Sequence, residues 1–376
     1  MNENEILGFD PTQLSVYNQE ENKSQANLNS NLYKPKPADS KSEDGHYYST
    51  IKVIYNPFDL KHSILEQQSY GLQDSDGWFS VISSLTINDT NCPIFKAWKK
   101  CHYAEKGSDL WLQAATKEND PRGKGLFDKR FARYVTIQVL EDKNHPELEG
   151  KYMFWKLPKS IYDIMNAKMN PSKESGKAAI PVMDFLFGRS LDLEVIPGPD
   201  DPQHPERKAR ETKYMAQLSE EAVSCINPDK SPLLNDEEQE VLDEYVNNMS
   251  KVWRTKDPNE RASMIANINN DPNTKKLEKI YRNVLETIKK YCPNLIEELS
   301  YKEWDDATKA RVQKWIDLVL ACKDPGVTEN VPEAAATVGT TTQATPAPQA
   351  AAPQPAAPQA SSMVFNASEP TDDLPF

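Results

Sequence analysis

The hydrophobic and polar positions change their period near residue 200, and the two parts of the chain predict different structures. Between residues 46 and 198, short runs rich in β-branched and aromatic residues are bounded by Gly, Pro, Asp and Asn, which is typical of β-strands. Five runs have this pattern: YYSTIKVIYNPFD, GWFSVISSLTI, RFARYVTIQVLED, KYMFWKLP and DFLFGRSLDLEVIPG. We therefore predict five strands in this part of the chain.

Two stretches between these strands have helical spacing instead. Apolar residues recur at positions on one face of a helix in CPIFKAWKKCHYAEK and in KSIYDIMNAKM. Five strands with a helix between the later ones are typical of a small, partly open barrel of the OB type. The prediction is an α+β fold whose five-stranded OB-type barrel, with inserted helices, occupies residues 46–205.

After Pro197 the pattern becomes helical. Four runs carry apolar residues at i, i+3 and i+4: RKARETKYMAQLSEEAVSCI, NDEEQEVLDEYVNNMSKVWRTK, TKKLEKIYRNVLETIKKYC and DDATKARVQKWIDLVLACK. Asn235 stands three residues before Glu238, and Asp271–Pro272 precedes the third run, as at helix starts. These runs predict a helical bundle over residues 206–325, with charges of both signs on its solvated outer faces.

Both ends of the chain have compositions that do not support a packed core. Residues 1–45 are rich in Asn, Gln, Ser and Glu, and predict a disordered arm that carries Lys34, Lys36 and Lys41. Residues 326–365 are rich in Ala, Pro and Gln, and predict a semi-extended linker. An acidic tip over residues 366–376 ends the chain.

The net charge of −13 argues against a nucleic-acid partner unless the charges are segregated. They are segregated, because residues 95–160 hold 14 Lys and Arg against 9 Asp and Glu, which leaves +5 in this window. Aromatic residues are interleaved with these cations. Single strands bind to such surfaces, since cations follow the phosphates while bases stack on the rings.

Half or more of these aromatic rings could equally fill the core. The alternation of side chains along the strand helps to choose which residues are candidates for DNA binding. In RFARYVTIQV, Phe131 and Arg133 share a face with Val135, whereas Arg130 and Tyr134 lie on the more polar face. Lys129, Arg130 and Tyr134 are therefore the leading candidates. The full set of predicted DNA-binding residues is Lys99, Lys100, Trp111, Arg122, Lys124, Lys129, Arg130, Arg133, Tyr134, Lys156, Lys159 and Tyr162.

The stretch PRGKGLFDKR has glycines and basic residues, as phosphate-binding loops have. A G-x-G pattern without a preceding strand and a following helix is weak as a nucleotide motif. We interpret it as a loop whose Arg122 and Lys124 contact backbone phosphates.

Over residues 46–196 the order of motifs resembles the single-stranded-DNA-binding (helix-destabilising) proteins of T-even phages. The resemblance is carried by YYSTIKVIYNP, GWFSVISS, CPIF, KRFARYVTIQVLEDKNHPELEGK and KLPKSIYDIMNAKM. It implies an OB fold whose cleft binds single-stranded DNA through basic and aromatic side chains. It places Lys129, Arg130 and Tyr134 in the basic–aromatic strand, and Lys159 and Tyr162 in a later helix.

The family binds zinc through one His and three Cys, and this chain departs from that pattern. The family's Cys-Pro-x-Cys reads Cys92-Pro93-Ile94-Phe95 here, the His position falls at Tyr70, and the remaining Cys falls at Ser83–Ser84. A zinc site needs four ligands, and a replacement set of Cys92, Cys101 and His102 is awkward because adjacent residues diverge around a helix. We expect neither metal nor cofactor, with hydrophobic packing around Phe95 instead.

The ending TDDLPF resembles the acidic tip of bacterial single-stranded-DNA-binding proteins, which docks on replication and repair partners. Phe376 offers a ring beside the free carboxylate, and the acidic side chains would steer the tip toward basic pockets. The predicted partner-binding residues are Asp372, Asp373, Leu374, Pro375 and Phe376. In the phage family a basic arm drives cooperative binding, so self-association through residues 1–45 is a further hypothesis.

The five Cys are scattered singly and the N-terminus is acidic, which predicts a reduced, cytoplasmic protein, in the host cytoplasm if phage-encoded. Adjacent carboxylates and five unpaired His do not form a catalytic set, so we predict no enzyme. The leading hypothesis is a phage protein that coats and protects single-stranded DNA in replication, repair and recombination, and recruits proteins through its tip. The alternative is an interaction scaffold without direct DNA binding; RNA versus DNA stays open.

Overall fold

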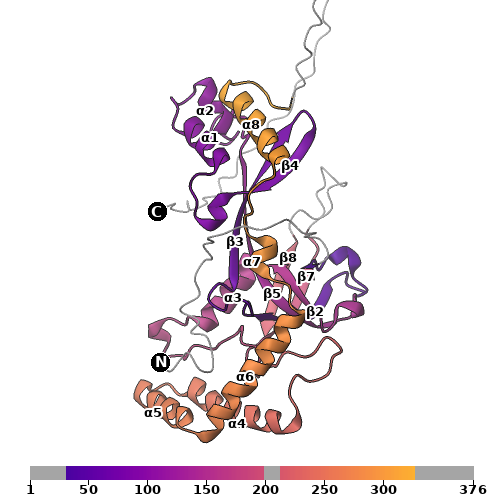
Figure 1. The fold of residues 1–376 in the computed structure, drawn as a ribbon, viewed down its shortest axis with the longest axis vertical. Coiled ribbons are helices and arrows are strands. Elements are labelled where there is room, and N and C mark those ends of the chain that lie inside the picture. Colours follow the sequence, from indigo (N-terminus) through magenta and orange to yellow (C-terminus); the bar gives the residue numbers. More distant parts are fainter. Residues whose placement is uncertain (1–30, 199–211, 327–376) are drawn as a thin grey trace, which may run out of the picture. The chain divides into compact units, whose positions relative to one another are not determined.

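The longest strand, β5 (Asp128–Asp142), holds the sheet together in the computed structural model, which describes residues 31–198 and 212–326 (Figure 1). The first half of β5 pairs with β3 (Ile64–Asp74), and its second half pairs with β2 (Tyr47–Ile54). Its middle also pairs with β6 (Tyr152–Lys156). All three pairings are antiparallel, so β5 connects every part of the sheet.

Four shorter strands extend this centre. Beyond β2 lie β7 (Ser190–Ile196) and then β8 (Lys213–Leu218), while β4 (Gly77–Ile82) forms a hairpin with β3. At the other end, β1 (Leu32–Tyr33) runs parallel to β6. The α+β class is confirmed. The sheet, however, is open among the described residues and has eight strands, so the five-stranded barrel itself is not confirmed.

The five predicted strands are all present, but the helix predicted from RKARETKYMAQLSEEAVSCI is wrong over Lys213–Leu218. That segment is β8, which pairs with β7 from Ile196 opposite Lys213 to Leu191 opposite Leu218. Tyr214, Ala216 and Leu218 alternate with more exposed residues and pack against the main core. The edge of β7 therefore decides the conformation of a segment whose own pattern is ambiguous.

Residues 31–45 also differ from the prediction of a disordered arm. Tyr33 is buried, and its hydroxyl donates a hydrogen bond to Asp142 Oδ2 and shares a second with the Ser49 hydroxyl, both at 2.8 Å. The Lys41 amide donates to the side chain of Asn144 at 2.8 Å. This part of the predicted arm is folded onto the sheet. Residues 1–30, most of the linker and the whole acidic tip lie outside the described residues.

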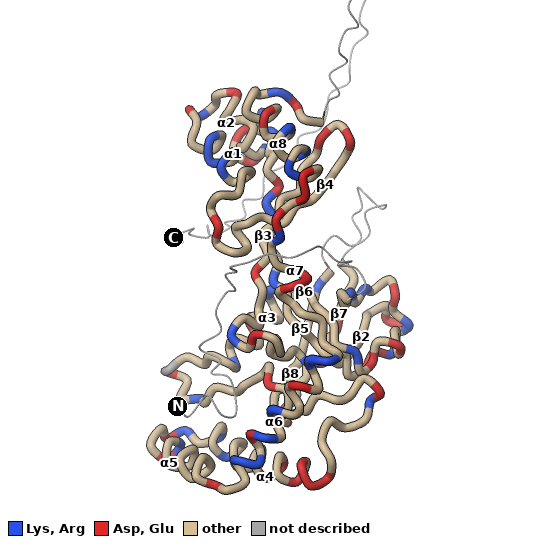
Figure 2. The backbone as a smooth tube through the Cα atoms, in the orientation of Figure 1, with Lys and Arg blue, Asp and Glu red and all other residues tan. Residues whose placement is uncertain are grey.

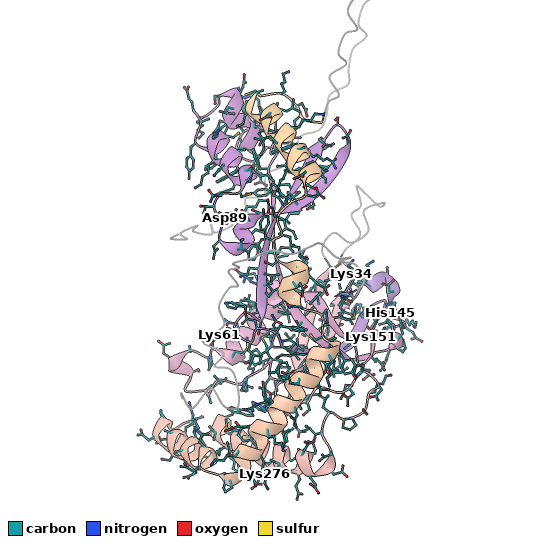
Figure 3. All side chains as sticks on the ribbon, in the orientation of Figure 1. Lys34, Lys61, Asp89, His145, Lys151 and Lys276 are labelled. Carbon is teal, nitrogen blue, oxygen red and sulfur yellow. The ribbon has the colours of Figure 1, made fainter. Side chains whose placement is uncertain are left out.

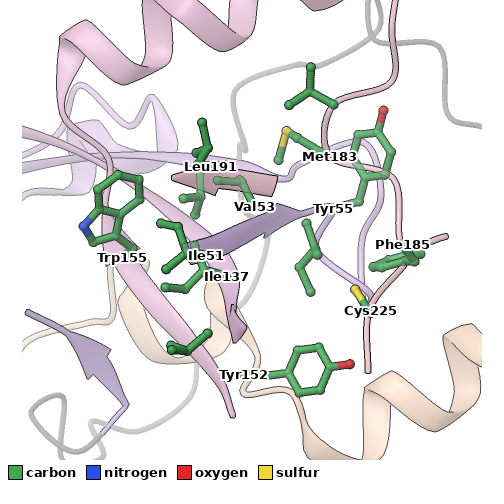
Figure 4. Packing of buried hydrophobic residues seen from close by; sticks show 14 of the residues in the cluster. Ile51, Val53, Tyr55, Ile137, Tyr152, Trp155, Met183, Phe185, Leu191 and Cys225 are labelled. Atoms are coloured by element: carbon green, nitrogen blue, oxygen red, sulfur yellow. The ribbon is translucent and has the colours of Figure 1, made fainter. Parts of the chain in front are cut away.

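The main core covers both faces of the sheet (Figure 4): Ile51, Val53 and Ile137 pack with Trp155 and Leu191 on one face, and Tyr152 points to the other. α3 (Lys159–Met169) adds buried apolar residues from the next segment of the chain. Two further helices extend the same cluster at its other side, α4 (Asp236–Arg254) and α6 (Pro272–Tyr291), and α5 (Pro258–Asn269) packs against α4. α4 begins at the predicted capping box of Asn235 and Glu238.

The remaining helices cover other parts of the sheet. α1 (Pro93–His102), α2 (Asp109–Ala114) and α8 (Asp306–Leu320) surround the β3–β4 hairpin, and α7 (Leu295–Leu299) packs against β3 and β5. Helices predicted as one bundle are thus distributed over three hydrophobic clusters. Each cluster buries sheet surface that would otherwise face water.

The positions that the resemblance aligns with zinc ligands lie together in the hairpin cluster. Tyr70 and Cys92 are buried there, Ser83 Oγ donates to Cys92 Sγ at 3.3 Å, and Phe95 packs on the same cluster. Only Cys92 offers a thiolate, so this set does not fit zinc. In the described part of the chain, no group of three or more His, Cys, Asp or Glu side chains is placed to hold a metal ion.

No helix of the described residues is long and apolar enough to span a bilayer.

Candidate nucleic-acid interface

The two faces of β5 are distinguished by its pairing with β3, in which Gln68 stands opposite Phe131 and Glu66 opposite Arg133. Side chains of paired residues point to the same face. Phe131 and Arg133 therefore share a face with the core residues Val135 and Ile137, but near the end of the core. Phe131 is 49% exposed, so this face emerges from the core into solvent along the first half of β5.

Arg133 is the centre of a small group that we call the Arg133 cluster, made of Glu66, Phe131, Arg133 and Tyr162. Its guanidinium carbon lies 4.5 Å from the ring centroid of Tyr162 and 5.1 Å from that of Phe131. Its Nε donates to Glu66 Oε1 at 2.8 Å, which fixes the plane of the guanidinium. A guanidinium between two rings is an established arrangement for cation–π attraction.

This arrangement suits an unpaired nucleotide. Only the Nε–H of Arg133 is used in a hydrogen bond with another described side chain, so its terminal N–H groups can donate to a phosphate. Phe131 presents exposed ring surface on which a base can stack. Because the rings and Glu66 already hold Arg133 in place, binding would cost little side-chain entropy.

Further cations lie on the elements next to the cluster. Lys129 is exposed at the start of β5, and Lys159 is exposed in the first turn of α3, where it pairs with Asp163 at 2.7 Å. The loop between β2 and β3 adds exposed Phe58 and Lys61, and Figure 3 labels Lys61. Both loop residues were missed by the sequence reasoning, which had no prediction for β3.

The opposite face of β5 holds two of the leading candidates. Tyr134 is partly buried and packs with Leu65, Phe154 and α7, and this burial raises the pKa of its hydroxyl. Lys156, opposite Tyr134, is exposed. The structure therefore separates Tyr134 from Arg133 and Lys129, and α7 covers the face that the alternation pattern favoured.

Arg130 is exposed on that opposite face, but it is engaged with a carboxylate. Its Nε and Nη2 donate to Asp128 Oδ2 at 2.8 and 2.6 Å. The guanidinium lies directly over Gly71, where an added Cβ would come within 2.6 Å of Nη2. Gly71 thus permits this close approach, and any larger residue there would displace Arg130.

The remaining predicted residues come from the α1–α2 region. Lys99 and Lys100 are exposed on α1, whereas Trp111 is half-buried on α2. Arg122 is exposed and pairs with Asp120 at 3.0 Å, and Lys124 is exposed in the same loop.

The glycine loop does not present its backbone to a phosphate. The amides of Lys124, Gly125 and Leu126 donate to the carbonyls of Leu112, Ala115 and Gln113, at 2.8 to 3.0 Å. Gly123 packs so closely that an added Cβ would lie 2.5 Å from two backbone oxygens of the preceding segment. These bonds use the donors that a phosphate-binding loop needs. The glycines serve packing, and only the side chains of Arg122 and Lys124 remain available.

A hollow of about 460 Å³ lies over β2, β5, β7 and β8, away from the Arg133 cluster. Glu141, Asp192 and Glu194 line it together with Lys143 and the partly exposed Tyr48. An acidic lining repels phosphates, so we do not assign DNA to this hollow.

An exposed basic and aromatic sheet face is the kind of surface on which proteins hold single-stranded nucleic acid. In line with this class, the chain is similar to the single-stranded DNA-binding proteins of Enterobacteria phages T2 and T4, each 24% identical over 152 residues. The match covers 40% of this chain and 46% of each relative, so the chain spans about half the length of these curated relatives. No protein-family model matches the chain.

Proposed function

We propose that this protein binds single-stranded DNA without catalysis, and that the Arg133 cluster is the centre of its binding surface. The observation that carries the proposal is the guanidinium held between Phe131 and Tyr162, with exposed ring surface and unused N–H donors beside it. Both relatives are named for binding and not for a reaction. Residues 46–205 would form the DNA-binding part, as an opened form of the OB-type barrel that the phage resemblance implies.

The wider role that follows is coating and protecting single-stranded intermediates of phage replication, repair and recombination. The rival function is a protein-interaction scaffold that does not bind DNA. A fluorescence titration with poly-dT, duplex DNA and RNA at two salt concentrations separates the two, because phosphate contacts make binding weaken as salt rises. Quenching by poly-dT that weakens with salt supports DNA binding, and no quenching by any of the three polymers supports the scaffold.

Replacing Arg133 tests the centre of the surface. Arg133→Ala removes both the phosphate donor and the support of the two rings, so we expect affinity for an oligo-dT to fall by about 10- to 100-fold, since hydrogen bonds to charged groups are worth about 1.5–3 kcal/mol. Fluorescence anisotropy with labelled oligo-dT measures the change. Tyr134→Phe, on the covered face, should bind as the wild type does.

Arg311 provides a matched control for this experiment. Its guanidinium also lies over a ring, that of Phe79, at 4.0 Å, and it also pairs with a carboxylate, that of Asp74, at 2.6 Å. It lies in α8, against the β3–β4 hairpin. Arg311→Ala should lower stability and leave DNA affinity unchanged. Equal losses of affinity in the two variants would contradict the assignment of the Arg133 cluster.

The C-terminal tip would recruit replication and repair proteins through Asp372, Asp373 and Phe376. A peptide ending in TDDLPF with a free carboxylate should bind such a replication or repair protein. If the partner contacts both the Phe376 ring and the C-terminal carboxylate, the same peptide with an amidated end, or with Phe376→Ala, should bind at least tenfold more weakly. Cooperative self-association through residues 1–45 would appear as steeper poly-dT binding than in a chain lacking residues 1–30.

A further inference from the structure

The outer surface of α1 carries rings and cations that are exposed or only partly buried. Ile94, Ala97 and Cys101 are buried against the hairpin cluster and α8, which fixes the orientation of the helix. The rest of the helix surface and the C-cap residue Tyr103 form the group that we call the α1 face: Phe95, which also touches the cluster at one edge, with Trp98, Lys99, Lys100, His102 and Tyr103.

The rings of the α1 face form a stacked ladder. Phe95 and Trp98 are 5.7 Å apart with an angle of 8° between their planes, and Trp98 and His102 are 4.6 Å apart at 16°. His102 then meets Tyr103 edge-on at 5.0 Å. The ladder supports Tyr103, whose side chain is 74% exposed and presents open ring surface to solvent.

The charge on α1 is of one sign. The helix contains Lys96, Lys99 and Lys100 and no acidic residue, and Figure 2 shows the blue lysine positions along it. In the described part of the chain, no carboxylate lies within ion-pair distance of these three lysines. Lys99 instead lies over the Phe95 ring at 4.6 Å. Lys96 donates to Asn91 Oδ1 at 3.0 Å, which leaves its charge uncompensated. Cations without a carboxylate partner, beside an exposed ring, are complementary to a polyanion that carries flat, apolar bases.

The α1 face lies along the same side of the sheet as the Arg133 cluster. The pairing of β3 with β5 places Tyr70 opposite Lys129 and Gln68 opposite Phe131. Tyr70 belongs to the cluster on which α1 packs. A strand leaving Phe131 past Lys129 therefore continues toward α1 without crossing to the other face of the sheet.

We propose that the α1 face is a second contact for the same single strand, with a base stacked on Tyr103 and phosphates held by Lys99 and Lys100. This inference rests on the proposed function and extends it. It divides the bound strand between an inner segment on the Arg133 cluster and an outer segment on α1. Short oligonucleotides occupy the inner segment, and longer ones reach both.

Oligonucleotide length provides the test. Tyr103→Ala and the double variant Lys99→Ala, Lys100→Ala are compared with wild type on oligo-dT of about 5 and about 16 nucleotides, which bracket the usual site sizes of OB folds. We expect unchanged affinity for the short oligonucleotide and about 5- to 100-fold weaker binding of the long one, the range expected for loss of one stacked base. Tyr48→Ala, an exposed tyrosine beside Glu194, is the matched control and should bind both lengths normally.

The outcomes separate this inference from the function on which it rests. If Arg133→Ala weakens both lengths while the α1 variants bind the long oligonucleotide as wild type does, the α1 face is not a DNA contact. If wild type binds neither length, the proposed function itself fails.

Crosslinking of the long oligonucleotide with 5-iododeoxyuridine should label Tyr103 or Trp98, and labelling confined to the Arg133 cluster overturns the inference. Loss of binding to anionic vesicles in Tyr103→Ala, with DNA binding intact, would assign the face to a membrane surface instead.

Discussion

Lys52 and Asp184 are both fully buried, although lysine and aspartate side chains are almost always exposed to solvent in folded proteins. Asp184 accepts hydrogen bonds from the amides of Leu186 and Phe187 at 2.9 and 3.1 Å and from the Tyr281 hydroxyl at 3.1 Å. Lys52 donates to the Val223 carbonyl. The pair joins β2, the loop before β7 and α6 at one buried point.

Burial of Asp184 and Lys52 makes the stability of the fold depend on pH. It raises the pKa of Asp184 to about 6 from its usual value of 3.8, against the opposing effect of the amide hydrogen bonds and Lys52, and it lowers the pKa of Lys52. Between about pH 4 and pH 6 the folded protein keeps a proton on Asp184 that the unfolded chain has released. Stability from this group is therefore complete below pH 4 and is lost as the pH rises through 6.

Asp184→Asn should remove this pH dependence. We expect the free energy of unfolding of wild type, relative to the variant, to fall by up to about 3 kcal/mol between pH 4 and pH 6, since one pKa unit corresponds to about 1.4 kcal/mol. Urea denaturation followed by Trp fluorescence at several pH values measures it. The exposed carboxylate variant Asp192→Asn should keep the wild-type profile, and parallel profiles for wild type and Asp184→Asn would refute the assignment.

At the scale of elements, α8 closes a cluster that α1 and the β3–β4 hairpin cannot bury alone. Trp304 and Trp315 insert into this cluster, and their indole N–H groups donate to the carbonyls of Ile82 and Gln73, both at 2.9 Å. A segment from the C-terminal part of the described chain therefore completes the packing of residues 64–102. The positions that the resemblance aligns with zinc ligands lie in this same cluster, which is stabilised by the packing of indole rings and other apolar side chains.

Trp315→Ala should destabilise the fold by about 3–5 kcal/mol, because it removes a buried indole and leaves a cavity. Trp315→Phe keeps much of the ring volume but loses the bond to Gln73, so we expect a smaller cost of about 1–2 kcal/mol. Hydrogen exchange across β3 and β4 should show the loss locally, with β2 and β7 less affected. Tyr291→Ala, on an exposed position of α6, serves as the control; uniform loss of protection across the sheet would mean that α8 does not act on the hairpin specifically.

The elements that the sequence predicted correctly are those whose signals are local. The five strands have β-branched runs of their own, and the Asn235 capping box is formed within four residues. β3 was missed because ILEQQSYGLQD contains polar residues on both faces, several of which bond to distant segments, as Gln67 does to the Leu299 carbonyl at 2.6 Å. β8 was assigned to a helix because its strand conformation depends on β7.

The segregated cations and rings of the sequence pointed to the region that contains the Arg133 cluster, and Arg133 and Tyr162 were both among the predicted DNA-binding residues. Alternation along β5 separated its two faces correctly, but it could not show which one is covered. That depends on α7, which packs over Tyr134 from more than 150 residues further along the chain and leaves Phe131 exposed.

At the scale of the whole molecule, a chain with a net charge of −13 would bind DNA only because its charges are unevenly distributed. The acidic hollow over β7 and β8 and the lysines of α1 lie on different elements. Electrostatic steering of a polyanion depends on such local fields and not on the net charge. Acidic residues elsewhere in the chain still oppose the approach of DNA over distances of about one Debye length.

The acidic tip allows this opposition to be measured. Deleting residues 370–376 removes Asp372 and Asp373 without touching any described residue. We expect tighter binding of oligo-dT at about 10 mM salt, by about twofold to tenfold, with the difference vanishing near 1 M salt, where the Debye length has fallen from about 30 Å to about 3 Å. Anisotropy titrations across this range provide the measurement, and Asp372→Asn with Asp373→Asn in the full-length chain is the control for the charge.

If the deletion tightens binding and the double amide variant does not, the tip acts through something other than its charge. Unchanged affinity at low salt in both would show that the tip has no influence on DNA binding, and would leave partner recruitment as its proposed role.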